Sequence, residues 1–241
     1  MAAALFFGPP GRQLYGYHHV PRGAPTSAVL LCPPWGREYQ YAHRTLGVLA
    51  GRLQARGVHV LRFDYSGTGD SWGDSTQGDF QSWVDDLEHA VQELRLASGL
   101  PLVDLVGLRL GGYLAARASG RIPNIRTLVL WDPVTHGGVW IEEMGAPEAF
   151  ASGLVELGDL LVTEEFVEEV RSLRPEHMEE AHAHETICLI TQEDHDYPDP
   201  PTLPGSRTDH LPQPAPWRED ASIWSGKVPP DAVKRIVEWL T

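Results

Sequence analysis

The stretch Val106-Gly107-Leu108-Arg109-Leu110-Gly111-Gly112-Tyr113 decides the fold of this chain. An apolar run over residues 102–106 precedes the glycines, and a run of small residues over 113–118 follows them. This pattern predicts a strand, a tight turn and a helix, which is the setting of a nucleophile elbow with the motif G-x-S-x-G. An arginine, Arg109, stands where that motif has its serine.

Arg109 changes the chemistry that the turn can perform. A guanidinium has a pKa above about 12, so it offers no lone pair to a nucleophile or general base, and ordinary serine-hydrolase chemistry is excluded at this position. It can bind a carboxylate or phosphate, and the free N–H groups at a helix N-terminus also favour anions. Two interpretations follow: an anion clamp, or a buried ion pair with Asp132 or Asp194 that seals an old cavity.

The rest of the chain alternates between predicted strands and helices, which indicates an α/β fold with a mostly parallel sheet covered by helices on both faces. Between the sixth strand and residue 185 the sequence is acidic and helix-forming, so we expect a small helical cap over 133–185 inside a single domain of residues 1–241. Residues 194–216 predict a long loop with one short strand near 206–211. The expected strands include 27–31, 58–64, 102–106, 125–131 and 186–191, and the expected helices include 42–56, 80–96 and 230–240.

Composition restricts the partners. The formal net charge is −14, which repels nucleic acid and anionic membranes, so neither is an expected partner. Two cysteines cannot build a disulfide framework or a cysteine-rich zinc site, which favours a reducing cytoplasm. The run Met1–Phe7 lacks a positive flank and is too short for a signal peptide or a membrane span. We expect no metal and no cofactor, and the oligomeric state stays open.

Four motifs together resemble the α/β-hydrolase superfamily: the loop C-P-P-W-G-R-E-Y at 32–39, the turn D-Y-S-G-T-G-D-S at 64–71, the elbow at 107–112 and L-W-D-P-V at 130–134. The chain is most similar to the serine-aminopeptidase-like branch near the exosortase-associated hydrolases, whose members include proteins with G-L-R-L-G at the elbow. The resemblance implies the α/β-hydrolase fold over almost the whole chain and a place in a biosynthetic pathway. Hydrolase activity does not follow from a fold.

The family's catalytic triad, carried over by position, is degenerate here. The nucleophile position holds Arg109, while Asp132 and Asp194 stand where the resemblance implies an acid. The implied histidine should follow the last strand, yet residues 211–241 contain none, and His210 alone could replace it. Loss of the nucleophile from such a unit lowers turnover by about 10⁶-fold.

The resemblance also implies an oxyanion hole built from the N–H of Leu110 and an N–H near Trp35. Together with Arg109, these donors would converge on one anion. Our first hypothesis is therefore that the protein binds a small metabolite carrying a carboxylate or a phosphate. One form of this hypothesis is that the protein also transforms the metabolite. His43 and His136 are candidates to face the same cleft and move protons with an acid.

Two alternatives stand beside this hypothesis. Cys32 adjoins the oxyanion loop and could serve as the nucleophile of an acyl hydrolase or thioesterase, although a cysteine at a strand end is more often a small buried hydrophobe. The second alternative is a noncatalytic binding or scaffolding protein that assists a biosynthetic partner protein. Tryptophans at predicted strand ends, Trp35, Trp131 and Trp140, are expected to line an apolar pocket.

Two further motifs favour structural interpretations. The run Asp194-His195-Asp196 is interpreted as a solvated loop, because a metal site needs additional ligands and supporting groups. The glycine-rich turn at 64–71 has the spacing of neither a dinucleotide-binding loop nor a P-loop. We interpret it as a tight turn that ends a strand.

Overall fold

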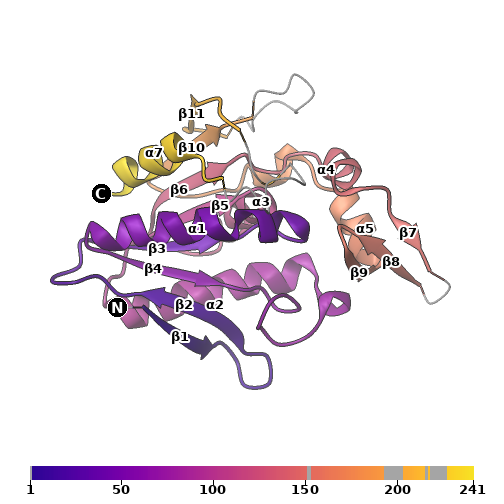
Figure 1. Ribbon diagram of the computed structural model, residues 1–241, viewed down its shortest axis with the longest axis horizontal. Coiled ribbons are helices and arrows are strands. Elements are labelled where there is room, and N and C mark those ends of the chain that lie inside the picture. Colours follow the sequence, from indigo (N-terminus) through magenta and orange to yellow (C-terminus); the bar gives the residue numbers. More distant parts are fainter. Residues whose placement is uncertain (1, 151–152, 193–202, 215–216, 218–226) are drawn as a thin grey trace.

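Figure 1 shows the computed structural model of the protein, which describes residues 2–150, 153–192, 203–214, 217 and 227–241. Its centre is one eight-stranded sheet with the strand order β1-β2-β4-β3-β5-β6-β10-β11. At one edge β1 pairs antiparallel with β2, and β2 pairs antiparallel with β4. The strands β4, β3, β5, β6, β10 and β11 run parallel to one another. The strands are β1 (Ala2–Phe7), β2 (Leu14–His19), β3 (Ser27–Cys32), β4 (Val58–Phe63), β5 (Val103–Leu108), β6 (Ile125–Trp131), β10 (Glu185–Ile190) and β11 (Arg207–His210).

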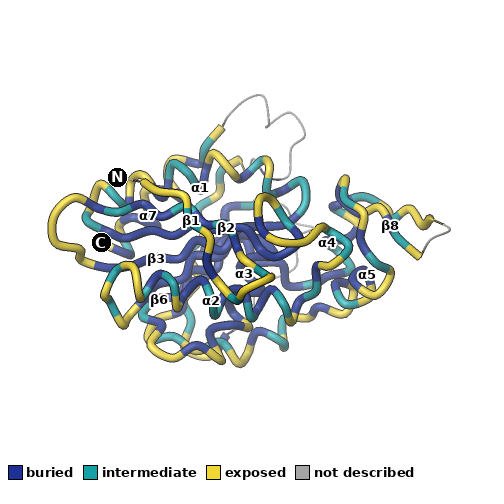
Figure 2. The backbone as a smooth tube through the Cα atoms, turned by 90° about the horizontal axis from the view of Figure 1, so that it is seen from below, coloured by how far each residue is buried: buried dark blue, intermediate teal, exposed yellow. Residues whose placement is uncertain are grey.

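Helices cover both faces of this sheet, as the alternating pattern predicts. The helices α1 (Arg37–Ala55) and α7 (Pro230–Leu240) pack on one face, while α2 (Phe80–Ser98) and α3 (Leu110–Ser119) pack on the other. Successive residues of β3 alternate between the two cores, with Leu30 facing α2 and Leu31 facing α1. Because both faces are covered, the central strands are buried along their whole length (Figure 2).

Two helices are longer than the periodicity predicts, for local reasons. The predicted helix 80–96 ends at Ser98, where Gly99 takes the left-handed conformation with φ 72° and closes the last turn. Its first turn is capped by the Asp79 carboxylate, which accepts a hydrogen bond from the Ser82 N–H at 2.8 Å. The predicted helix 42–56 begins earlier, at Arg37, directly after Gly36 with φ 63°.

The insertion after β6 is only partly helical, which corrects the expectation of a helical cap. It contains α4 (Gly137–Met144), α5 (Glu164–Arg171) and a short turn of helix η2 (Pro175–Met178), and a separate three-stranded antiparallel sheet lies between α4 and α5. That sheet is formed by β7 (Glu148–Ala149), β8 (Leu154–Leu157) and β9 (Leu160–Thr163), and Figure 1 shows it projecting beside the body. The hairpin forms because Gly158 and Asp159 both have positive φ, at 56° and 66°, as a two-residue turn requires.

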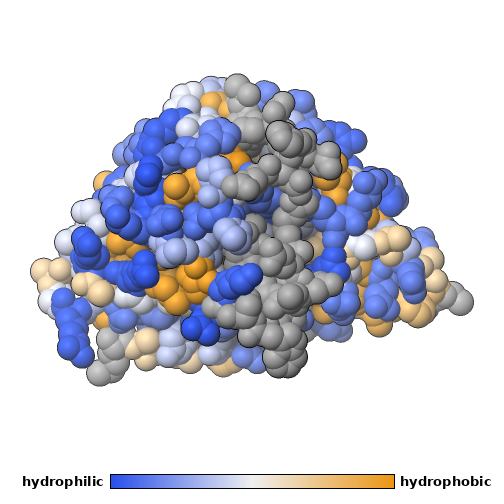
Figure 3. Space-filling model, turned by 45° about the horizontal axis from the view of Figure 1, so that its top comes forward, coloured by the Kyte–Doolittle hydropathy of each residue, from blue (hydrophilic) through white to orange (hydrophobic). Residues whose placement is uncertain are grey.

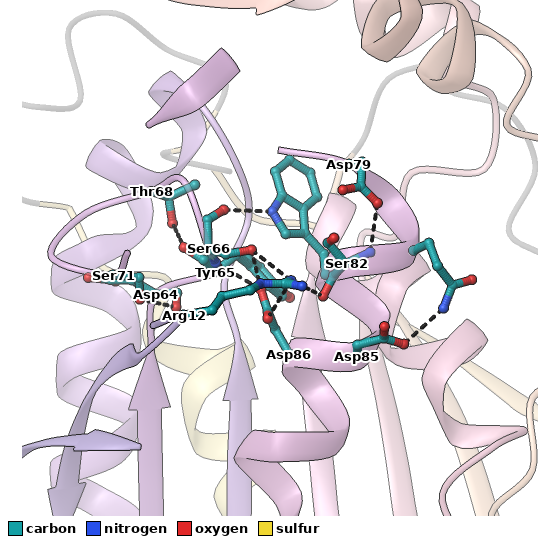
Figure 4. A network of polar contacts seen from close by, with 12 residues as sticks. Arg12, Asp64, Tyr65, Ser66, Thr68, Ser71, Asp79, Ser82, Asp85 and Asp86 are labelled. Atoms are coloured by element: carbon teal, nitrogen blue, oxygen red, sulfur yellow. Dashed lines mark hydrogen bonds and ion pairs between the residues drawn. The ribbon is translucent and has the colours of Figure 1, made fainter. Parts of the chain in front are cut away.

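The glycine-rich turn after β4 is the tight structural turn that the sequence predicts. A side chain at Gly69 would place its Cβ 2.1 Å from an oxygen of the Asp64 carboxylate, around which the turn wraps. Figure 4 shows how the turn is fastened to α2: the buried Asp86 carboxylate accepts hydrogen bonds from the N–H and hydroxyl of Ser66, both at 2.8 Å. Arg12 pairs with the same carboxylate at 2.9 Å. The polar groups of Ser66 are therefore used to hold the turn against α2.

The face shown in Figure 3 is largely polar. Blue, hydrophilic side chains cover much of the face in Figure 3, with apolar groups scattered between them. Across the described residues, no helix is both long and apolar enough to cross a bilayer.

Candidate functional site

The elbow keeps its strained geometry although its serine is replaced. Arg109 joins β5 to α3 with φ 55° and ψ −122°, a conformation that non-glycine residues rarely adopt. The neighbouring glycines allow the close packing that holds it. At Gly111 a Cβ would lie 2.3 Å from the main-chain oxygens of both Cys32 and Pro33, and at Gly107 it would lie 2.5 Å from the Gly111 oxygen. The sequence thus builds a nucleophile elbow with arginine at its tip.

The guanidinium of Arg109 is held between two carboxylates. Its side chain has no exposed surface, and its Nε donates to Oε1 of Glu38 at 2.7 Å. Its Nη2 pairs with the carboxylate of Glu143, and its Nη1 lies 3.4 Å from the main-chain oxygen of Asp132. The second oxygen of Glu38 accepts a hydrogen bond from the indole of Trp140 at 3.1 Å. The buried charge is therefore paired and hydrogen-bonded, which is the condition for burying it at all.

This arrangement leaves little capacity for another anion. With both carboxylates ionised, one positive and two negative charges give the cluster a net charge of −1. Burial raises the pKa of Glu38, although the Arg109 charge opposes this effect. A cavity of only about 10 Å³ adjoins Arg109, about the space of one water. In this conformation the ion-pair interpretation describes Arg109, but its carboxylate partners include Glu38 and Glu143, which the sequence analysis did not single out.

The sequence around Glu38 and Glu143 contains a weak indication that each has a buried partner. Glu38 lies on the buried stripe of α1 together with Ala42, Leu46 and Leu49, and an acid on an apolar helix face indicates a buried partner. Glu143 stands in the mostly apolar helix α4, and its side chain is 17% exposed. Spacing cannot reveal that both meet the elbow.

Asp132 is placed by β6 and β10. Its carboxylate accepts hydrogen bonds from the N–H of Thr191 at 2.7 Å and from the Thr191 hydroxyl at 2.5 Å. Burial raises the pKa of Asp132 to about 6, against the lowering effect of these hydrogen bonds. The carboxylate thus fastens the ends of two neighbouring strands. Asp194, the other acid candidate, lies outside the described residues.

The histidine candidates separate in space. His136 precedes α4 and lines the small cavity beside Arg109, with its Nδ1 3.1 Å from the hydroxyl of Thr135. His43 is an exposed residue of α1 that lines a different and larger cavity. His210 is the last residue of β11, which lies three strands from β5 in the sheet. Of these three, the structure brings only His136 to the cavity beside the elbow.

The oxyanion loop is packed into the core. Cys32 is completely buried, and this burial raises the pKa of its thiol far above the usual value, so the reactive thiolate does not form near neutral pH. Leu110, whose N–H would belong to the oxyanion hole, is also buried, as the first residue of α3. The ring centroid of Trp35 lies 5.9 Å from that of Trp140 and 5.2 Å from that of Phe166.

The tryptophans therefore do not form the walls of an open pocket, which corrects the sequence expectation. Trp35 and Trp140 are 2% and 1% exposed and fill the space between elbow and insertion. Trp131 is buried on the opposite face, where its ring meets Trp217 edge to face at 5.1 Å. Tilted and edge-to-face contacts among large rings fill this space.

Comparisons with known proteins agree with this architecture. The serine aminopeptidase S33 family matches residues 25–185. Similar solved structures include Est1E from Butyrivibrio proteoclasticus with bound ferulic acid, which is 16% identical over 98% of this chain and 99% of that chain with a TM-score of 0.72. The alpha/beta hydrolase GrgF from Penicillium sp. sh18 is 14% identical over 100% and 98% of the two chains, with a TM-score of 0.74. The proline iminopeptidase of Mycobacterium smegmatis is 13% identical over 99% and 97%, with a TM-score of 0.66.

No curated protein matches this sequence significantly. At such low identities the structural likeness establishes the fold alone, which is the α/β-hydrolase fold.

Proposed function

The chain belongs to the serine aminopeptidase S33 family of α/β hydrolases, and within that family we propose that it is a noncatalytic member that acts as a binding or scaffolding protein. The proposal depends on the elbow. Arginine cannot attack a carbonyl, and the neighbouring Cys32 is a buried, protonated thiol. The cavity next to the elbow has no room for an acyl substrate. The catalytic apparatus of the family is thus degenerate in this chain.

One observation carries the proposal: the buried Arg109 guanidinium is shared by Glu38 of α1 and Glu143 of α4. It connects the elbow, the body of the domain and the insertion after β6. Such an ion-pair cluster fixes one arrangement of packed elements, because leaving any of its charges unpaired is costly. We infer that the former nucleophile position now fastens α4 over the elbow and holds a surface for a biosynthetic partner protein in the cytoplasm. The G-L-R-L-G elbow supports a place near the exosortase-associated hydrolases.

A second candidate function is the binding of a small carboxylate- or phosphate-bearing metabolite. The carboxylate of Glu143 favours it, because this acid comes from the insertion, is 17% exposed and pairs with Arg109 where a ligand carboxylate would pair. Displacement of α4 would then present Arg109, together with the N–H groups of Leu110 and Trp35, to the ligand. Whether such a ligand is transformed depends on His136 and Asp132, which lie near the same turn.

A turnover assay with p-nitrophenyl acetate, p-nitrophenyl octanoate and acetyl-thioester substrates tests the noncatalytic proposal. We expect no turnover above buffer for the wild type, for Arg109→Ser or for Cys32→Ala, because none of these proteins has both a nucleophile and a base. Wild-type turnover that Cys32→Ala abolishes would refute the proposal and establish an acyl hydrolase or thioesterase.

Glu143→Gln separates the second candidate from the first. This substitution removes one of the negative charges that compete with an external anion. If Arg109 is an anion clamp, the variant should bind acetate or inorganic phosphate at least about tenfold more tightly than the wild type does. Glu142→Gln, at the neighbouring position of α4, is the matched control. Equal and negligible affinity in both variants would remove the anion-binding candidate.

A further inference from the structure

A second cavity, of about 280 Å³, lies away from the elbow. It opens where β3 and β4 end, between β2 and the first half of α1. The rings of three tyrosines, from β2 and α1, face it together with one arginine and one buried acid, and the residues that matter are Tyr15, Tyr17, Tyr39, Arg62 and Asp64. Its volume is close to the lower limit for small-molecule sites, about 300 Å³. A ligand with a single ring would fill it.

Arg62 is the unusual member of this cavity. It is half-buried on β4, its Nε donates to Nε2 of His19 at 3.3 Å, and its guanidinium carbon lies 5.5 Å from the ring centroid of Tyr17. Burial, together with the Arg62 charge, lowers the pKa of His19 to about 4, so this partner stays neutral at neutral pH. Within the described residues Arg62 forms no ion pair with a carboxylate.

An arginine without a carboxylate in ion-pair contact is unexpected in this chain, which has 33 acidic residues and 19 lysines and arginines. Two other arginines are paired: Arg126 of β6 binds both oxygens of Asp104, and Arg109, directly after β5, is held by its two glutamates. Half-buried charges normally have such partners. Because the Nε of Arg62 is already engaged, its two terminal nitrogens remain as an end-on fork, which matches the two oxygens of a carboxylate.

A buried acid that lines the same cavity has the opposite character. The Asp64 carboxylate is buried and accepts hydrogen bonds from the Tyr39 hydroxyl at 2.5 Å and from the Asp70 N–H at 3.1 Å. The turn shown in Figure 4 holds Asp64 in place, because the Ser71 hydroxyl donates to its main-chain oxygen at 2.6 Å. A carboxylate has about four acceptor positions, so Asp64 can accept another hydrogen bond. This cavity therefore offers donors from Arg62, aromatic walls, and an acceptor from Asp64.

We propose that this cavity is a binding site for a small aromatic carboxylate that carries a hydrogen-bond donor on its ring. The carboxylate pairs with the terminal nitrogens of Arg62, the ring packs among Tyr15, Tyr17 and Tyr39, and the donor faces Asp64. The site does not include Arg109 and is independent of the function proposed for the elbow. Like the elbow, it lies at the carboxyl ends of the parallel strands, and Arg62 is on β4, two strands from β5 in the sheet.

Isothermal titration calorimetry with three probes tests the chemistry of the site. We expect 4-hydroxybenzoate, which has both the carboxylate and the donor, to bind the wild type most tightly. Benzoate lacks the donor and 4-hydroxybenzamide lacks the charge, so both should bind more weakly. Absence of 4-hydroxybenzoate binding throughout the millimolar range would overturn the proposal.

Variants locate the site. Arg62→Gln should weaken 4-hydroxybenzoate binding by about tenfold or more, which is the usual effect of losing a charge-assisted contact. Arg207→Gln is the matched control, because Arg207 also lies over an aromatic ring, that of Trp239 at 4.9 Å, but at the far edge of the sheet. Equal affinity in both variants would refute the role of Arg62.

Gly47→Glu tests whether 4-hydroxybenzoate binding can be lost without misfolding. Gly47 lies on α1, and a Cβ there would be in ordinary contact with Nη1 of Arg62 at 3.8 Å. A glutamate at this position can supply an internal carboxylate, and replacing glycine inside a helix favours folding. We expect this variant to be as stable as the wild type and to lose 4-hydroxybenzoate binding. A stable Gly47→Glu protein that binds the probe as the wild type does would contradict the proposal.

Discussion

Arg109→Met would remove the guanidinium that Glu38 and Glu143 share while keeping a side chain of similar length. The cavity created would be small, so the main effect is electrostatic. Glu38 is 3% exposed and would stay buried without its positive partner. Breaking a buried ion pair from one side costs about 3–5 kcal/mol. We expect a loss of this size in the free energy of unfolding, which is a large fraction of the about 5–15 kcal/mol typical of a domain.

A double-mutant cycle separates the ion pair from other effects of the substitution. Glu38→Gln keeps one acceptor oxygen, which can serve Arg109 or Trp140 but not both. Because Arg109 still has the Glu143 carboxylate as a charged partner, this single change should cost less than Arg109→Met. The double variant no longer contains an unpaired buried carboxylate at position 38. We expect it to be more stable than the sum of the single effects predicts, with a coupling of about 1–3 kcal/mol.

The pH dependence of Arg109→Met supplies a second check. Burial raises the folded-state pKa of Glu38, and the variant lacks the guanidinium that opposes this effect. A group whose pKa is raised on folding stabilises the protein below its unfolded pKa, about 4.3 for glutamate, and loses this effect as pH rises through the folded value. The destabilisation of Arg109→Met relative to wild type should therefore be smaller at about pH 5 than at about pH 7.

Urea unfolding followed by tryptophan fluorescence and by far-ultraviolet circular dichroism measures these quantities, provided that the two signals change together. Wild-type stability of Arg109→Met at neutral pH would show that the cluster stabilises nothing. A coupling energy near zero would show that Arg109 and Glu38 do not act as a pair. Either result would refute the structural role assigned to the elbow.

Three further predictions concern packing and buried groups. Gly111→Ala should destabilise the protein by about 2 kcal/mol or more, because its Cβ would lie 2.3 Å from main-chain oxygen; Gly138→Ala, with open space around it, should be neutral or slightly stabilising by thermal melting. Cys32 and Cys188 should react with Ellman's reagent only after denaturation, since both thiols are buried, and fast labelling of the native protein would contradict their placement. Burial and a neighbouring histidine lower the pKa of His18 to about 4, below its unfolded value near 6.5, so stability should fall as pH drops between these values. His18→Phe should remove about 1–3 kcal/mol of this pH dependence; parallel stability curves for the two proteins would refute it.

Much of the fold could be predicted from local sequence. The apolar run before Gly107 and the small residues after it specify strand, turn and helix without reference to any other part of the chain. The closing helix Pro230–Leu240 has the bounds that its periodicity predicts. The insertion was predicted less well, because the G-D turn at 158–159 lies within acidic sequence that also favours helix.

The candidate site divides in the same way. That Arg109 cannot act as a nucleophile follows from its side chain alone, and its place on an elbow follows from the glycines around it. Which acids meet it does not follow, because Glu38, Glu143 and Arg109 are separated by 71 and 34 residues along the chain. Such partners are chosen by the packing of α1 and α4 against the elbow.

Residues that lie close together in the chain therefore specify the class of fold, the geometry of the turn, and the fact that Arg109 itself cannot act as a nucleophile. The tertiary structure decided that Arg109 is paired and enclosed, that the tryptophans fill space, and that Arg62 faces a separate cavity. These outcomes depend on which distant side chains share a low-dielectric interior, where an unpaired charge is too costly to persist. Only the folded arrangement fixes those neighbours.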